Sequence, residues 1–188
     1  MNVAVLGGSF DPPHIGHYWI AHQVLEKRKD IEKILLMPVS KHQWKPITAS
    51  SEDRFNMLGS LLDNDIEISD IEIKRGGISY TEDTLRVLKI KYEKIYWIVG
   101  SDILEEYEKW EKKEELLNLA TFLVFPRDPY LMPKSLPTGF EEVSTDNDLI
   151  TSNISSTKVK NRIKKGLSIT NFVPEGIANF IKSKNLYI

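Results

Sequence analysis

Short apolar runs alternate with longer segments of helical periodicity along this chain, and this order limits the fold more than any other feature. The runs that read as buried strands are NVAVLG (2–7), KILLMPV (33–39), KIYWIVG (94–100) and TFLVF (121–125). Strands separated by helices of about 10 to 15 residues are typical of βαβ units, which build parallel sheets. The sequence therefore predicts an α/β fold, a Rossmann-like parallel sheet with helices on both faces, in a single domain over residues 1–188.

The remaining elements follow from periodicity, caps and turn residues. Apolar spacing predicts helices at 14–29, 50–62, 81–92, 101–120, 155–165 and 174–184. DIEISDIEIKR (65–75) alternates apolar and polar residues as a half-exposed strand does, and FEEVS (140–144) is predicted as a further short strand. Ser50 and Asp53 resemble a capping box, and Pro174 fits a first helical position.

Composition excludes several classes of protein. A chain of 188 residues with 41% hydrophobic and 28% charged residues suits one globular domain. The absence of cysteine excludes disulfides and thiolate metal sites and fits a cytoplasmic protein. The net charge of −2 gives no bulk attraction to nucleic acid. Because no apolar run approaches the roughly 20 residues of a membrane span, we expect no membrane partner. A homo-oligomer is compatible with the sequence, which does not fix the oligomeric state.

The stretch GGSFDPPHIGH (7–17) follows the first predicted strand and combines glycines with two histidines. Gly7 and Gly8 allow close approach of a ligand to the backbone, and the helix start that follows favours an anion. His14 and His17 are three residues apart, so they share a face of the first helical turn. Two imidazoles there can donate hydrogen bonds to phosphate oxygens and stabilise charge during phosphoryl or nucleotidyl transfer. The alternative is a tight turn that carries two surface histidines.

A second polar motif, GSD (100–102), follows the strand predicted at 94–100. Parallel sheets bind ligands beyond the carboxyl ends of their strands, so this motif and the histidine stretch are expected at one crevice. The carboxylate of Asp102 can accept hydrogen bonds from ribose hydroxyls. It can equally be an acidic residue that favours a helix start.

The stretch at 7–17 resembles the signature of the nucleotidylyltransferase superfamily, whose HIGH element also occurs in class I aminoacyl-tRNA synthetases. Four further segments resemble bacterial nicotinate-nucleotide adenylyltransferases: RGGISYTEDTL (75–85), VGSDILEEYEKW (99–110), NISSTKVK (153–160) and FVPEGIANFIKSKNLY (172–187). The resemblance covers essentially the whole chain in the right order. It implies that the phosphate of nicotinate mononucleotide attacks the α-phosphorus of ATP, releasing pyrophosphate and forming nicotinate adenine dinucleotide for NAD synthesis.

The resemblance also implies roles for individual residues and for a metal. The catalytic residues would be His14 and His17. Binding of ATP and its phosphates would fall to Gly8, Ser9, Phe10, Lys45, Gly100, Asp102, Ser155, Ser156, Thr157 and Lys160. The nicotinate nucleotide would be bound by Tyr80, Thr81 and Trp110. The cofactor would be Mg²⁺, held mainly by substrate phosphates.

Some of these residues have a second interpretation. HQWK (42–45) stands where the family more often shows PPHK, so Lys45 is either the phosphate-binding loop lysine or a solvated one. Thr81 can cap a helix as well as meet the nicotinate. Trp110 lies in a charged run and must bury its ring in the fold or stack it on a ligand. Lys160 stands where the family usually carries an arginine.

Three other functions are compatible with parts of this sequence. The first is another small-molecule nucleotidylyltransferase, because such enzymes share the histidine motif. Examples are pantetheine-phosphate adenylyltransferase, a cytidylyltransferase and nicotinamide mononucleotide adenylyltransferase. The segment at 75–85 and Trp110 argue against the pantetheine-phosphate enzyme and the cytidylyltransferase. The chain is too short and too acidic for an aminoacyl-tRNA synthetase core with an anticodon-binding domain. A nucleotide sensor without turnover has no use for the two histidines.

Overall fold

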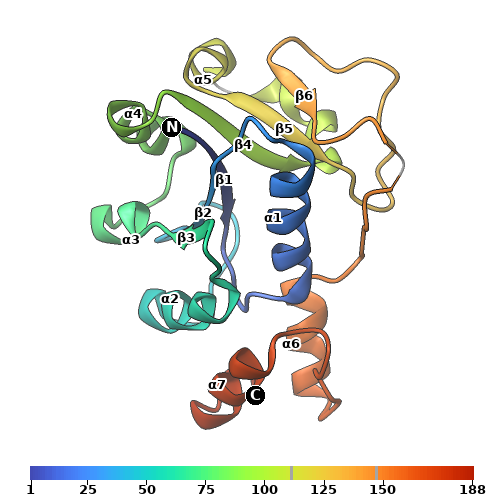
Figure 1. Ribbon diagram of the computed structural model, residues 1–188. Helices are drawn as coiled ribbons and strands as arrows, with labels where there is room; N and C mark the ends of the chain where they lie inside the picture. Colours follow the sequence, from blue (N-terminus) through green and yellow to red (C-terminus); the bar gives the residue numbers. More distant parts are fainter. Residues whose placement is uncertain (111, 147) are drawn as a thin grey trace. The chain divides into compact units, whose positions relative to one another are not determined.

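The computed structural model describes residues 1–110, 112–146 and 148–188 (Figure 1). Within these residues the strands form one six-stranded sheet in the order β3-β2-β1-β4-β5-β6. The strands are β1 (Asn2–Gly8), β2 (Lys33–Pro38), β3 (Ile66–Ile68), β4 (Lys94–Gly100), β5 (Thr121–Phe125) and β6 (Phe140–Glu142). β4 pairs in parallel with both β1 and β5, and β5 pairs in parallel with β6. The predicted Rossmann-like parallel sheet is confirmed.

The helices lie between these strands and after the last of them. They are α1 (Ile15–Lys27), α2 (Ser51–Leu58), α3 (Ile71–Arg75), α4 (Thr81–Lys91), α5 (Lys113–Leu119), α6 (Ser156–Lys164) and α7 (Glu175–Ser183). Short 3₁₀ turns occupy Gly59–Leu61, Ser101–Glu105 and Tyr107–Lys109. No helix among the described residues is both long enough and apolar enough to cross a bilayer.

The chain forms two compact units, each assembled from three separate segments. The first unit consists of Met1–Leu6, Ile20–Leu35 and Tyr80–Asn153. The second unit consists of Gly7–Trp19, Leu36–Ser79 and Ile154–Ile188. The expectation of one domain over residues 1–188 stays a prediction.

The first unit contains the middle of the sheet and helices on both of its faces. The crossover from β1 to β2 through α1 and the crossover from β4 to β5 through α5 run in opposite directions along the sheet. Because parallel crossovers are right-handed, α1 and α5 cover opposite faces, as Figure 1 shows. α4 packs against α5 and β4. The core between these layers is made of fully buried strand residues such as Val3, Ile95 and Leu123.

The second unit packs α2 against α7. α2 begins as predicted, because the Ser50 hydroxyl accepts a hydrogen bond from the Asp53 amide at 3.0 Å and donates one to its carboxylate at 2.7 Å. The inner face of α7 is buried through Ile177 and Ile181. Pro174 is the cap of α7 and not its first helical residue, because its ψ of 150° is extended.

The strand predicted at 65–75 is wrong in its second half. β3 ends at Ile68, and the Ser69 amide makes one last hydrogen bond to the Leu36 carbonyl, at 2.9 Å. The chain then turns into α3, where the Lys74 amide donates to the Asp70 carbonyl and the two side chains form an ion pair, each at 2.8 Å. This i,i+4 ion pair stabilises a helical turn, which the alternation of apolar and polar residues did not reveal.

The single helix predicted at 101–120 is also wrong. Two 3₁₀ turns and α5 fill this segment, of which Glu111 lies outside the described residues. Trp110 is extended, with a ψ of 128°, and Lys112 has a left-handed backbone with a φ of 56°. These two conformations interrupt the helix, although the charged residues on either side all have good helix propensity.

Candidate active site

The predicted site residues are divided between the two units. The residues predicted for the phosphates lie mostly in the second unit, with the turn after β1, the loop after β2 and the start of α6. The residues predicted for the nicotinate and the adenosine lie in the first unit, at the start of α4 and after β4.

Phe10 shapes the turn after β1. Its backbone is left-handed, with a φ of 48°, and its side chain is 1% exposed. A bulky residue in this conformation is a true outlier, which persists only where the surroundings impose it. The Phe10 ring lies over Gly8 and contacts the His17 ring, with 4.7 Å between centroids. The side chain of Phe10 therefore supports His17. The part of Phe10 that can face a phosphate is its backbone.

His14 and His17 form a stacked pair at the start of α1. Their ring centroids are 3.7 Å apart with an interplanar angle of 28°. The His14 amide donates a hydrogen bond to Nδ1 of His17 at 3.1 Å. Because Nδ1 accepts this bond, the hydrogen of a neutral His17 ring is assigned to Nε2. His17 is thus fixed as a donor through Nε2, which is the form required to hydrogen-bond a phosphate oxygen.

Asp11 is a site residue that the sequence prediction missed. It is 2% exposed, and its carboxylate accepts four hydrogen bonds. Oδ2 accepts from the Thr48 amide at 2.9 Å and from Nζ of Lys160 at 2.8 Å. Oδ1 accepts from the Ala49 amide and from the Tyr187 hydroxyl, each at 2.9 Å. Burial alone would raise the pKa of Asp11, but these hydrogen bonds, that of Lys160 first, bring the pKa below its ordinary value.

The start of α6 is tied to the same turn. The Ser155 hydroxyl caps the helix by accepting from the Lys158 amide at 3.2 Å. The Ser156 hydroxyl donates to the Pro12 carbonyl at 2.8 Å. Lys160 forms its ion pair with Asp11, and its side chain is 22% exposed. The structure therefore brings the predicted phosphate motif of α6 to the histidine turn, while direct phosphate contacts of Ser155, Thr157 and Lys160 stay predictions.

Arg54 is the second residue that the sequence prediction missed. Its side chain is 1% exposed although it carries a full charge. Burial lowers the pKa of the guanidinium, and the nearby Asp11 carboxylate opposes that change. The guanidinium donates to the carbonyls of Ser9, Val39, Ser40 and Ala49 and to the hydroxyl of Ser51, at 2.8 to 3.3 Å. Arg54 thus joins the turn after β1 to both ends of the loop after β2.

The loop that carries Lys45 is organised around a histidine. Nδ1 of His42 accepts from the amides of Trp44 and Lys45, at 3.1 and 3.3 Å. Burial and the charge of Lys45 lower the pKa of His42, which keeps its ring neutral and able to accept. The side chains of Trp44 and Lys45 are exposed. A phosphate contact of Lys45 stays a prediction.

In the first unit, Gly100 and Asp102 stand at the carboxyl end of β4. A Cβ on Gly100 would lie 2.3 Å from Oδ1 of Asp102, so no side chain fits without displacing the carboxylate. Nη1 of Arg127 donates to the other carboxylate oxygen at 3.0 Å. Ser101 is 2% exposed and accepts from the Arg127 amide at 2.9 Å. Asp102 is therefore held in one orientation, and its contact with a ribose stays a prediction.

The predicted nicotinate residues lie on different elements of the first unit. Tyr80 is 48% exposed and is itself the cap residue of α4, so Thr81 is the first helical residue and not the cap. Trp110 packs its ring against Tyr107, Phe122 and Phe140, with centroid distances of 5.7, 5.1 and 6.0 Å. The ring is half-buried. Its packing in the fold is shown, and stacking of its remaining surface on a pyridine stays a prediction.

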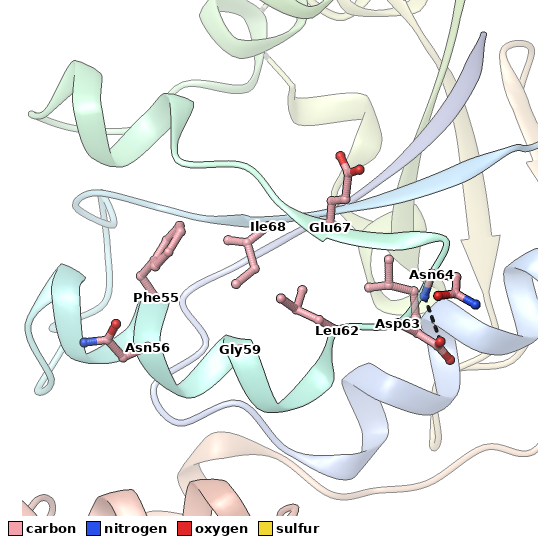
Figure 2. Close-up of a pocket in the computed structure, with 9 residues that line it drawn as sticks. Phe55, Asn56, Gly59, Leu62, Asp63, Asn64, Glu67 and Ile68 are labelled. Carbon is pink, nitrogen blue, oxygen red and sulfur yellow. Dashed lines mark hydrogen bonds between the residues drawn. The ribbon is translucent and has the colours of Figure 1, made fainter.

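A hollow of about 500 Å³ lies elsewhere in the second unit, between α2 and β3. Figure 2 shows the apolar side chains of Phe55, Leu62 and Ile68 pointing toward one another across it. None of the predicted site residues lines this hollow. It offers neither histidine nor arginine nor lysine to a phosphate, so the candidate site remains the histidine turn.

A divalent cation bound by the protein alone would need several oxygen or nitrogen ligands from its side chains. Among the residues that the structure describes, no group of three or more histidines and carboxylates could hold a metal ion. Asp11, the carboxylate on the histidine turn, already accepts four hydrogen bonds. A magnesium ion at this site would therefore depend on oxygens of the substrates.

The sequence and the fold both have relatives among known proteins. The cytidylyltransferase-like family matches residues 5–162. The "Probable nicotinate-nucleotide adenylyltransferase" of Opitutus terrae is 35% identical over 195 residues, covering 100% of this chain and 98% of the relative. The protein of the same name from Hydrogenobaculum is 37% identical over 199 residues, covering 100% and 98%. Among solved structures, Plasmodium falciparum nicotinic acid mononucleotide adenylyltransferase, complexed with NaAD, aligns with a TM-score of 0.80 at 20% identity, covering 99% and 97%.

The fold and the histidine turn together define a nucleotidyltransferase, and the chain belongs to the nicotinate-nucleotide adenylyltransferase family within the cytidylyltransferase-like group. The family resemblance predicted from the sequence is confirmed. The likeness to the Plasmodium structure concerns the fold alone.

Proposed function

We propose that this enzyme joins ATP and nicotinate mononucleotide to give nicotinate adenine dinucleotide and pyrophosphate, as a step of NAD biosynthesis. The observation that carries the proposal is the stacked histidine pair, in which His17 is held as an Nε2 donor, on the turn to which Ser156 at the start of α6 is hydrogen-bonded. The names of the relatives supply the acceptor.

The reaction needs no nucleophile from the protein. An oxygen of the mononucleotide phosphate forms a bond to the α-phosphorus of ATP, and the bond from that phosphorus to the bridging oxygen breaks, so that pyrophosphate leaves. The task of the protein is positioning and charge stabilisation. His17 donates from Nε2 to phosphate oxygens as their charge grows, and His14 stacks on it. Mg²⁺, if bound through the substrate phosphates, would supply further positive charge, and we expect activity to require it.

One assay tests the proposal directly. Pyrophosphate release from ATP is measured with nicotinate mononucleotide, nicotinamide mononucleotide or phosphopantetheine as the acceptor. Release with the nicotinate compound supports the proposal. Pyrophosphate release with phosphopantetheine alone contradicts the proposal, and so does release in the absence of any acceptor.

The acid mononucleotide is expected to be preferred over the amide. The segment around Thr81 begins α4, whose free amides and dipole favour a carboxylate. The amide would bring an NH₂ group toward these donors and leave polar groups poorly paired, at a cost of about 1–3 kcal/mol. This corresponds to roughly 5- to 150-fold in kcat/KM. Equal kcat/KM for the two mononucleotides would contradict the assignment of the 75–85 segment.

Lys160→Ala is expected to weaken the use of ATP. The change removes a positive charge from the middle of α6 and leaves the buried Asp11 carboxylate without its ion-pair partner. The loss of one charged hydrogen bond corresponds to about 1.5–3 kcal/mol, or roughly 10- to 150-fold in kcat/KM for ATP. Lys158 and Lys164 are exposed neighbours on the same helix, and their alanine variants are the matched controls. A normal Lys160→Ala enzyme beside an impaired Lys164→Ala enzyme would show that Lys164 holds the phosphate role.

The setting of the enzyme is proposed on the same basis. We expect it to work in the cytoplasm on nucleotide substrates, without nucleic-acid or membrane partners, and a homo-oligomer is compatible with this proposal. The absence of cysteine and the net charge of −2 support this setting.

A further inference from the structure

Tyr187 follows α7 in the second unit and reaches the carboxylate of Asp11. Its hydroxyl donates to Oδ1 of Asp11 at 2.9 Å, while Lys160 donates to Oδ2 at 2.8 Å. Nζ of Lys160 also lies 5.9 Å from the centroid of the Tyr187 ring, within the range of a cation–π interaction. Tyr187 therefore touches both members of the ion pair that ties α6 to the histidine turn.

The backbone of Tyr187 adopts a costly conformation. Its φ is 67°, in the left-handed region, and its side chain is 4% exposed. For a bulky residue this conformation is unfavourable and persists only where other contacts impose it. The amide of Leu186 bonds to the Ile181 carbonyl at 3.0 Å, which fixes the chain just before the strained residue. Such outliers gather at functional sites, and the second one in this unit is Phe10, against His17.

Core filling alone does not explain a tyrosine at this position. A phenyl ring would fill the same space without burying a hydroxyl, and a buried hydroxyl is costly unless it is hydrogen-bonded. Burial and the Asp11 charge both raise the pKa of Tyr187, so the hydroxyl keeps its proton and acts as a donor. The particular contribution of this side chain is therefore the hydrogen bond to the carboxylate.

We propose that Tyr187 is a positioning residue of the phosphate half of the site, which holds Asp11 and Lys160 together so that the lysine ammonium is oriented for ATP. The proposal rests on the proposed function, because it takes ATP as the ligand of Lys160. Tyr187 acts through the ion pair and need not touch the substrate. Without its hydroxyl, Oδ1 of Asp11 keeps only the Ala49 amide as a donor, so the carboxylate and the Lys160 ammonium paired with it are held less firmly.

Tyr187→Phe tests the proposal, with the KM for ATP, the KM for the mononucleotide and kcat measured separately. We expect the KM for ATP to rise about 5- to 20-fold, the scale of a weakened charged contact. The KM for nicotinate mononucleotide should change less than twofold. Binding of a non-hydrolysable ATP analogue, measured by calorimetry, should weaken by the same factor as the KM for ATP. Calorimetry measures binding without turnover, so it tests the role of Tyr187 independently of the proposed reaction. Failure of the proposed reaction would instead be seen as absence of product with the unmodified enzyme.

Tyr92→Phe is the matched control. Tyr92 is 7% exposed, and a lysine ammonium lies 5.1 Å from its ring centroid, but it belongs to the first unit. This variant loses the hydroxyl of a similarly buried tyrosine and should leave the KM for ATP unchanged.

A double variant separates positioning from packing. If Tyr187 acts through Lys160, Tyr187→Phe should raise the KM for ATP when Lys160 is present. In a Lys160→Ala background the same substitution should raise that KM less than twofold. An unchanged KM for ATP in Tyr187→Phe, or the same fold-change in both backgrounds, would overturn the proposal. Loss of folding in Tyr187→Phe would overturn it as well, because the hydroxyl would then serve stability.

Discussion

His17→Ala is expected to fold normally and to lose about 100-fold or more in turnover. This is the scale for removing one donor that stabilises charge developing in a transition state. The ring of His17 is held by the His14 amide, by the His14 ring and by Phe10. Its Nε2 hydrogen is therefore aimed before substrate arrives, and such preorganised donors have the largest effects on rate.

Circular dichroism and steady-state rates would check this result. His22→Ala, which alters the histidine on the first-unit part of α1, is the control and should keep full turnover. A folded His17→Ala enzyme with near-normal turnover would remove the histidine pair from the mechanism. The nicotinate and adenosine residues of the first unit would then have to account for catalysis.

Arg54→Leu is expected to cause the largest loss of stability among single changes in the second unit. Leucine keeps the apolar stem in the core but removes every donor. The carbonyls of Ser9 and Val39, which are part-buried and accept at 2.9 and 2.8 Å, would lose this partner. Breaking such a buried charged network costs about 3–5 kcal/mol. For a chain of this size the thermal midpoint should fall by roughly 6–20 °C.

Thermal and urea unfolding would measure the change. Arg86→Leu is the control, because Arg86 is an exposed arginine that forms ion pairs with Glu82 and Glu115 on the surface. Exposed ion pairs contribute about 0–1 kcal/mol, so this variant should stay close to the unmodified protein. Equal midpoints for the two variants would show that the Arg54 hydrogen bonds contribute no more than surface contacts.

The strands were the most predictable part of the fold. β4 and β5 have the bounds that the apolar runs at 94–100 and 121–125 indicated, because a buried strand between polar turns leaves a sharp boundary in the sequence. The segments 65–75 and 101–120 were mispredicted. In 101–120 the left-handed backbone of Lys112 interrupts a helix whose side-chain pattern continues, and in 65–75 a helical turn with the Asp70–Lys74 ion pair replaces the second half of the strand.

The site was predictable where a local motif carries it and unpredictable where distant residues complete it. The spacing of His14 and His17 is visible in the sequence, and so is the serine cap of α6. Nothing local shows that Arg54 is buried, because an arginine in an amphipathic helix normally faces solvent. The partnership of Asp11 with Lys160 and Tyr187 is equally hidden, since it depends on the tertiary fold alone.

The four hydrogen bonds of Asp11 also order events during synthesis of the chain. Two of its donors come from Thr48 and Ala49, which leave the ribosome soon after it. The other two lie 149 and 176 residues downstream, at Lys160 and Tyr187. A nascent chain therefore carries the histidine motif long before Lys160 is available to pair with the Asp11 carboxylate in that motif. Contacts between residues so far apart in sequence also slow folding. We expect the phosphate half of the site to mature only after translation has passed residue 187, so the growing polypeptide stays unable to bind ATP tightly while it is being made.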